Sequence, residues 1–247
     1  MRGIAKQPFI DCQEHIDTAA LKELNLEICS GIALSDIKAG VYGPGVVDAD
    51  QYGNFLELKN KLSTSGEYGW NRMTHNQQNL FSKLYLNLYN PSTTVYLRGP
   101  QKELDSKVAY RKKCYEEFYE WDDNINHFPK LKIWLDNLIG SVFDQYGRII
   151  FFIHEHDCKL LLHRDAPKQF PHRTEFLWLN PMMIKDFYVY DDITHEKHSV
   201  KTPAAFFNDL DMHGGEVSSS MTWSLRIDGV FTEEFRKRIG ISQYKFY

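Results

Sequence analysis

"RIIFFIHEHDCKLLLHRD" (Arg148–Asp165) is the stretch where the hydrophobic pattern of the chain changes to a period of two. It contains two short runs rich in isoleucine, leucine and phenylalanine, separated by a polar break. Runs of this kind, bounded by charged or turn-forming residues, are typical of β-strands. The stretch therefore predicts that the chain enters a β-structured region here.

The same pattern continues to residue 231. Each run is short, rich in β-branched or aromatic residues, and bounded by Pro, Gly, Asp or Asn. Evenly spaced short strands without intervening helices indicate an antiparallel sandwich or barrel, and eight strands suit a jelly roll. The eight predicted strands span residues 148–156, 158–165, 174–181, 186–192, 197–203, 204–211, 212–217 and 221–231.

The first half of the chain is mixed and partly helical. The longest pattern without helix breakers, residues 101–124, has Glu and Lys or Arg at helical spacing. A second amphipathic pattern, 128–147, has Pro129 in its first turn, and Asp17 is placed to cap another helix. The predicted helices span residues 17–28, 52–63, 75–89, 101–124 and 128–147, with a short one at 232–240.

These patterns predict an α+β fold with a mainly β core and N-terminal helices packed against it. At 247 residues the chain is expected to form a single domain, 1–247. Within it we distinguish a mixed, helix-rich support region (1–147), a jelly-roll core (148–231), and a C-terminal helix and tail (232–247).

Composition narrows the class of protein. Hydrophobic residues make up 43% and charged residues 25%, as in an ordinary globular protein, while aromatic residues reach 14%. The net charge of −4 argues against a nucleic-acid partner, which would require a basic face. No apolar run is long enough for a membrane span or a signal peptide. The four cysteines form no CxxC pair, so we expect buried thiols and a cytoplasmic location.

His163 and Asp165 end the second predicted strand. Residues two apart on a strand face the same side, so both side chains would point into or out of the roll. An unpaired carboxylate inside a roll is costly, and a metal ion would remove that cost. His213, which lies 50 positions after His163 beside two glycines, can supply a third ligand. The sequence therefore predicts a metal site formed by His163, Asp165 and His213.

Arg226 lies in the last predicted strand, with Ser224 two positions before it and on the same face. The order of "HRD" (163–165), "MHGG" with His213, and "SLR" with Arg226 resembles the Fe(II)/2-oxoglutarate-dependent oxygenases. In that family a His-x-Asp pair precedes a distal His and then a basic residue, on a double-stranded β-helix. The resemblance covers residues 148–231.

The resemblance implies a function for each of these residues. His163, Asp165 and His213 would hold Fe(II), and 2-oxoglutarate would chelate the metal through its keto-acid end. Arg226 and Ser224 would bind the distal carboxylate of 2-oxoglutarate, and O₂ would be the second co-substrate. The expected reaction is hydroxylation of an amino-acid, peptide or protein side chain, or of another small molecule.

Three further residues are candidates for contact with the substrate. Arg173 follows the His-x-Asp strand in a loop, where it could meet an acidic group. Trp178 and Asn180 share one face of the third strand and could line the pocket, although core packing explains the tryptophan equally well. The sequence does not indicate the substrate or the oligomeric state.

Other interpretations stay open. His154 and His156 form a His-x-His pair like that of cupin metal sites, but Lys159 and Leu160 occupy the place of the expected Glu. His172 lies in a loop. It could bind a metal, but no neighbouring motif indicates this. A jelly roll of this kind could also be a non-catalytic module that binds a ligand or a protein, or another cupin-like metalloenzyme. A measurement of bound metal would distinguish the binding module from an enzyme. Dependence on 2-oxoglutarate would distinguish an oxygenase from another cupin-like metalloenzyme.

Overall fold

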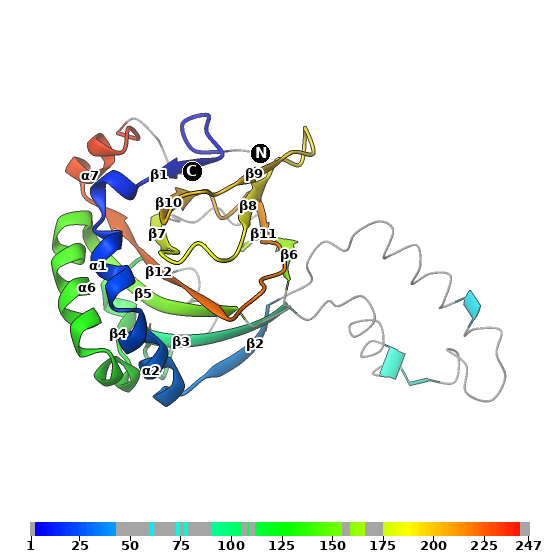
Figure 1. Ribbon diagram of the computed structural model, residues 1–247, viewed down its shortest axis with the longest axis horizontal. Coiled ribbons are helices and arrows are strands. Elements are labelled where there is room, and N and C mark those ends of the chain that lie inside the picture. The colour runs from blue at the N-terminus through cyan, green and yellow to red at the C-terminus, as the bar shows by residue number, and fades with distance from the viewer. Residues whose placement is uncertain are drawn as a thin grey trace.

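The computed structural model describes residues 3–42, 60–61, 73–74, 77–78, 90–104, 108, 112–154, 159–165 and 175–242. Within these residues the chain forms mostly antiparallel β-structure with few helices (Figure 1). The helices are α1 (Thr18–Glu23), α2 (Asn25–Leu34), α6 (Pro129–Val142) and α7 (Glu233–Arg238), with short 3₁₀ helices at Gln13–His15, Glu116–Phe118 and Asp123–His127.

Two antiparallel sheets contain the strands. The strands of the first half are β1 (Phe9–Asp11), β2 (Lys38–Tyr42), β3 (Asn90–Pro100) and β4 (Tyr119–Trp121). Those of the second half are β5 (Phe143–His154), β6 (Leu160–His163), β7 (Glu175–Leu179), β8 (Phe187–Tyr190), β9 (Lys197–Ser199), β10 (Ala204–Phe207), β11 (Met212–Gly215) and β12 (Thr222–Phe231).

The large sheet has the order β1-β10-β7-β12-β5-β3-β2, with β4 paired to β3, and the small sheet has the order β6-β11-β8-β9. From β5 to β12 the chain moves repeatedly between the two sheets. Sequence neighbours such as β5 and β6 therefore lie in different sheets, whereas β5 and β12, at opposite ends of this region, pair over most of their length.

All eight predicted strands of the second half are present, and the helix predicted at 232–240 is α7. Thr232 caps this helix by accepting a hydrogen bond from the Phe235 N–H. Asp17 likewise caps α1 by accepting from the Ala20 N–H, so the helical prediction at 17–28 is confirmed, with a break at Leu24 between α1 and α2.

Helix α6 confirms the prediction at 128–147 and ends earlier than expected. It begins at Pro129 and buries an apolar stripe formed by Leu131, Leu135, Leu138, Ile139 and Val142. Phe143 is already the first residue of β5, because its ring packs on Phe231 of the neighbouring β12 at a centroid distance of 5.3 Å.

The long helix predicted at 101–124 is wrong. Its described part contains a helical residue at Val108, turns, the 3₁₀ helix Glu116–Phe118, strand β4, which pairs with β3, and the start of the 3₁₀ helix Asp123–His127. Pairs of Glu and Lys on a helix contribute only about 0.2–0.5 kcal/mol each. Here Lys113 is instead fully buried against carboxylates, and Tyr119 is buried. The helices predicted at 52–63 and 75–89 lie almost wholly outside the described residues, and strands β1 to β4 were not predicted.

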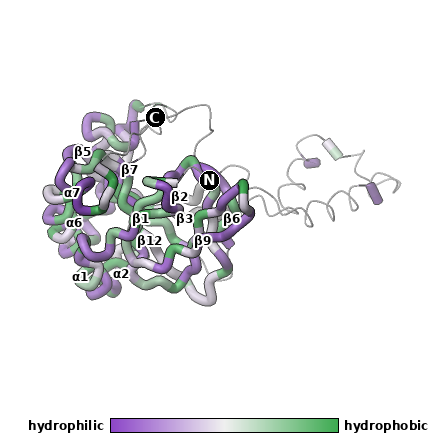
Figure 2. Tube along the Cα trace, turned by 90° about the horizontal axis from the view of Figure 1, so that it is seen from above, coloured by the Kyte–Doolittle hydropathy of each residue, from purple (hydrophilic) through white to green (hydrophobic). Residues whose placement is uncertain are grey.

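The hydrophobic core lies between the two sheets and beneath the helices on the outer face of the large sheet. Figure 1 shows α1, α2 and α6 together on this side. In Figure 2 many hydrophilic residues lie on these outer helices, while hydrophobic residues run along the strands. The interior of the roll is aromatic: Trp178 of β7 stacks on Phe187 of β8 with centroids 4.7 Å apart, and so joins the sheets.

The described cysteines take part in no disulfide: Cys12 and Cys114 are buried and Cys29 is partly buried. Burial raises the pKa of the Cys12 and Cys114 thiols to about 12, which makes them unreactive core residues as predicted. Cys158 lies outside the described residues. No helix in the described part of the chain has both the length and the apolar character needed to cross a membrane. The cytoplasmic location stays a prediction.

Candidate metal centre

The small sheet brings His163, Asp165 and His213 together. His163 of β6 and His213 of β11 are direct partners in the antiparallel ladder, and their ring centroids are 4.4 Å apart. Asp165 follows two residues after the end of β6. Its Oδ1 atom lies 3.4 Å from His163 Nε2 and 3.3 Å from His213 Nε2. One nitrogen or oxygen atom from each residue lies within 4.8 Å of the others.

The orientation of the His213 ring is fixed by the backbone carbonyl of Asp211. Its Nδ1 lies 3.0 Å from the carbonyl oxygen of Asp211, and a carbonyl can only accept, so Nδ1 carries the proton. Nε2 is therefore the ring nitrogen that faces Asp165. The ring is buried against Phe187 and Phe207, at centroid distances of 5.8 and 5.3 Å, which leaves it little freedom to rotate. A second-nitrogen bond of this type is typical of histidines that bind metals.

Asp165 is ionised in this setting. Burial raises the pKa of its carboxyl group, but His213, hydrogen bonds from both histidines and the charge of Arg226 together hold the pKa well below its ordinary value. Its Oδ1 atom faces the two imidazoles, while Oδ2 accepts a hydrogen bond from Arg226 Nη1 at 2.6 Å. One oxygen is thus directed to the histidines and the other to the arginine.

The donor set fits a divalent transition metal. With Nδ1 of His213 engaged by the Asp211 carbonyl, Nε2 is the nitrogen that faces the Asp165 carboxylate, and a cation between them could be bound by both. Two imidazole nitrogens and one carboxylate oxygen form the set that suits non-haem Fe(II), with further coordination positions left for other ligands.

Arg226 lies on β12 and is 3% exposed. Besides Asp165, it donates from Nη2 to Asp209 at 2.7 Å and from Nε to Asp228 at 2.8 Å. Its guanidinium carbon lies 3.7 Å from the ring centroid of Phe176. Burial lowers the pKa of Arg226, but the three carboxylates raise it more, so the net pKa lies above the ordinary value.

Two more cations complete this buried charge cluster. Lys113 Nζ lies 2.7 Å from Asp209 and 3.6 Å from Asp228, and Arg148 Nε donates to Asp228 at 2.7 Å. The side chains of Lys113, Asp209 and Asp228 are fully buried. Three cations therefore balance three carboxylates beside the two histidines. Sequence patterns did not indicate Lys113 or Asp209, because neither belongs to a motif and each acquires its partners only through the tertiary fold.

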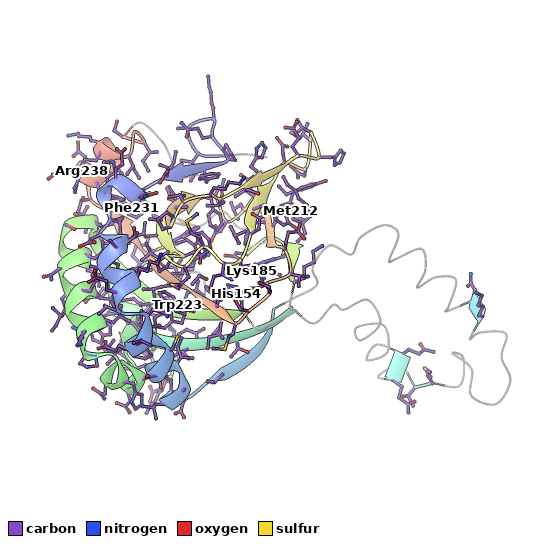
Figure 3. The ribbon with its side chains drawn as sticks, viewed as in Figure 1. His154, Lys185, Met212, Trp223, Phe231 and Arg238 are labelled. Atoms are coloured by element: carbon purple, nitrogen blue, oxygen red, sulfur yellow. The ribbon has the colours of Figure 1, made fainter. Side chains whose placement is uncertain are left out.

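Ser224 is buried, and its Oγ lies 3.3 Å from His154 Nε2 on the neighbouring β5. Burial, with the nearby charge of Lys185 as a second cause, lowers the pKa of His154 to about 3, so this histidine is neutral. Figure 3 shows the side chains of His154 and Lys185 close together. His154 therefore faces the interior, and His156, the second member of the cupin-type pair, lies outside the described residues.

Lys185 is a third residue that sequence analysis missed. It is 5% exposed and precedes β8. Its stem crosses Gly215 so closely that a Cβ at that position would lie 2.8 Å from Lys185 Cε. Gly215 and His213 are two apart on β11 and share one face, so the lysine lies on the same side of the strand as the histidine. Gly215, which follows "MHG", is the local sequence signal that another side chain lies close to the backbone at this position.

The predicted substrate residues are partly described. Trp178 and Asn180 are buried, with Trp178 in the aromatic interior. The Oδ1 atom of Asn180 has no hydrogen-bond partner among the described residues, and the same holds for Oγ1 of Thr222. Arg173 and His172 lie outside the described residues.

The chain was compared with known proteins, and the matches found are to solved structures. No protein-family model and no curated protein sequence matches the chain. Among solved structures, a Trichoplax adhaerens prolyl hydroxylase in complex with a hypoxia-inducible-factor peptide fragment is 9% identical, with a TM-score of 0.35 over 92% of this chain and 98% of that chain. A viral collagen prolyl hydroxylase from Paramecium Bursaria Chlorella virus-1 is 11% identical, with a TM-score of 0.28 over 56% and 80%.

The α-ketoglutarate-dependent epimerase SnoN of nogalamycin biosynthesis is 14% identical, with a TM-score of 0.30 over 86% of this chain and 84% of that chain. Likenesses with TM-scores below 0.5 establish neither a fold nor an activity. The side chains of the candidate site therefore carry the functional inference.

Proposed function

We propose that this protein is an Fe(II)- and 2-oxoglutarate-dependent oxygenase. The observation that carries the proposal is the convergence of His163, Asp165 and His213, with donor atoms within 4.8 Å of one another. This set has the composition of a non-haem iron site, and the order of its residues resembles that of the family. A non-catalytic binding module has no need of such a set.

The sheet order supports a double-stranded β-helix for β5 to β12. β5, β7, β10 and β12 lie in the large sheet, and β6, β8, β9 and β11 in the small one. The two histidines of the proposed metal site come from β6 and β11 of the small sheet, which are distant in the sequence, and Asp165 follows the end of β6. The division of residues 1–147, 148–231 and 232–247 within one domain is part of the same proposal.

His163, Asp165 and His213 would hold the ferrous ion. A bound ion would supply the redox chemistry with O₂, in which 2-oxoglutarate gives succinate and CO₂ and the second oxygen atom enters a C–H bond of the substrate. The protein's own residues orient the ligands: the Asp211 carbonyl fixes the His213 ring, and Phe187 and Phe207 keep water from it.

The distal carboxylate of 2-oxoglutarate would bind a buried cation together with the Ser224 hydroxyl. Among the buried cations of the described residues, we consider two for this purpose. Arg226 is the one predicted from sequence, and it already binds three carboxylates. Lys185 is the other, placed over Gly215 at roughly 7 Å along β11 from His213, a span comparable to a five-carbon diacid.

For the prime substrate we propose an amino-acid, peptide or protein side chain, with nucleic acid disfavoured by the net charge of −4. Trp178 and Asn180 would line the pocket, and Arg173 would meet an acidic group at its rim. Hydroxylation is the proposed outcome.

The test is anaerobic spectroscopy. Fe(II) and then 2-oxoglutarate are added to purified metal-free protein, and the visible spectrum is recorded. The proposal expects a weak charge-transfer band that requires both additions and disappears in His213→Ala. Absence of iron binding would favour the binding module. Iron binding without any response to 2-oxoglutarate would favour another cupin-like metalloenzyme.

A further inference from the structure

The position of Asp165 is not determined by the sheet. β6 ends at His163, so the carboxylate lies beyond the last ladder pair that the structure gives for this strand. Its backbone N–H donates to the carbonyl oxygen of Asp209 at 3.1 Å, and its Oδ2 accepts from Arg226. Both contacts come from parts of the chain that follow much later in the sequence.

Asp209 connects these two contacts. Its carbonyl oxygen holds the backbone of Asp165, and its Oδ2 accepts from Arg226 Nη2 and from Lys113 Nζ, each at 2.7 Å. Lys113 belongs to the N-terminal half of the chain, and its carbonyl oxygen accepts the Arg148 N–H. The guanidinium is therefore held on both sides by groups that are themselves buried and charged.

We propose that Arg226 is a positioning residue for Asp165, and that Asp209 and Lys113 hold Arg226 in place for this task. By binding Oδ2, Arg226 leaves Oδ1 alone to face His163 and His213. The inference rests on the proposed metal site. It gives Arg226 a role through Asp165 and leaves Lys185 and Ser224 to meet the distal carboxylate.

The geometry favours this role over direct binding of a ligand. Each of the three guanidinium nitrogens already donates to a different carboxylate, and the guanidinium packs on Phe176. A further carboxylate at Arg226 would be the fourth anion around one cation. It would have to bind the remaining N–H groups of Nη1 and Nη2 in a buried site that already holds three carboxylates, which is unfavourable.

The experiment measures metal affinity, without turnover. Co(II) is titrated into metal-free protein, and its visible absorption gives both the dissociation constant and the coordination geometry. Arg226→Met and Asp209→Asn are expected to weaken binding about 10- to 100-fold, the range usual for partners of metal ligands. Arg226→Lys, with a single nitrogen, is expected to be intermediate.

Arg236→Met is the matched control. Arg236 makes two hydrogen bonds to the buried Glu175, which lies on the opposite face of β7 from Phe176. This variant also breaks a buried arginine–carboxylate pair, but we expect its Co(II) affinity to stay within about threefold of the wild type. Thermal unfolding of the metal-free variants shows that each is folded, and Lys113→Met replaces Arg226→Met if the latter is not.

A double-mutant cycle separates positioning from general damage. If Arg226 acts through Asp165, then Arg226→Met should have no further effect on Co(II) affinity in an Asp165→Ala background. Additive losses, or unchanged affinity in Arg226→Met, would overturn the positioning role while the metal site stands. Failure of the wild type to bind Co(II), or binding unaffected by His213→Ala, would instead overturn the proposed function itself.

Discussion

His163 and His213 are direct cross-strand partners in the β6–β11 ladder, and their rings approach to a centroid distance of 4.4 Å. Because the two strands come from distant parts of the sequence, this contact forms only when the small sheet is assembled. The pair, with Asp165, is the basis for the first prediction.

Asp165→Ala and His213→Ala should each reduce Fe(II) affinity by at least about 100-fold, since each removes one of three ligands. Anaerobic equilibrium dialysis with iron analysis measures this. His195→Ala is the control, because His195 is exposed on a turn and contacts Tyr190. Iron bound as tightly by both ligand variants as by the control would refute the site.

Lys185→Met should weaken 2-oxoglutarate binding by about tenfold or more, because it removes a buried cation and keeps the stem that packs over Gly215. Metal affinity should not change. The measurement is a titration of the Fe(II)-loaded protein with 2-oxoglutarate without oxygen. Lys132→Met, on the outer helix α6 where Lys132 pairs with Asp136, is the control. Equal affinities in the two variants would leave Arg226 as the carboxylate ligand.

His154 should make the protein less stable as the pH falls. Its pKa is about 3 in the folded state and about 6.5 when unfolded, so between these values the unfolded chain binds a proton that the folded protein does not. Folding stability from this group is therefore complete above pH 6.5 and decreases on acidification toward pH 3.

His154→Asn removes this titration. Between pH 7 and pH 4.5, the wild type should lose about 2–3 kcal/mol more unfolding free energy than the variant. Urea unfolding of both proteins at both pH values measures the difference. Because the carboxylates titrate alike in both proteins, their contribution cancels in the comparison. A wild-type-minus-variant difference that is the same at both pH values would show that His154 does not have a depressed pKa.

Gly147 and Gly140 should respond to alanine with opposite signs. A Cβ at Gly147 would lie 2.1 Å from the carbonyl oxygen of Lys113, so Gly147→Ala should cost about 1–3 kcal/mol and disturb the backbone that places Lys113. Gly140 is exposed in helix α6 with nothing within 4 Å, so Gly140→Ala should stabilise by about 0.5–1 kcal/mol. Thermal unfolding of the two variants compares them directly.

The strands of the second half could be predicted because their signal is local. Each has its own period-two pattern and its own turn residues. The sequence also indicated that Asp165 lies beside His163, although Asp165 follows the end of β6 and is held by Asp209 and Arg226. The helix prediction for residues 101–124 fails for the opposite reason. The spacing of their charges suits a helix locally, but Lys113 is placed by carboxylates far away in the sequence.

The candidate site also combines features that the local sequence indicates with contacts that only the tertiary fold creates. Spacing indicated that Arg226 shares a face with Ser224 and lies near the metal ligands, but it could not reveal that three carboxylates surround the guanidinium. Lys185 lies in a stretch without any motif, and only its passage over Gly215 brings it into the interior. Sequence therefore indicates which residues face inward, and the fold determines which of them meet.

The pairing of β6 with β11 also has a consequence for assembly. The ladder has an irregularity between His213 and Gly215, and β11 is only four residues long, so backbone hydrogen bonds alone select its alignment weakly. A slip by one residue would turn His213 outward and separate it from His163. A metal ion held by both histidines would bind only the correctly aligned sheet. It would thus stabilise the correct register of β6 and β11 over the shifted one during folding.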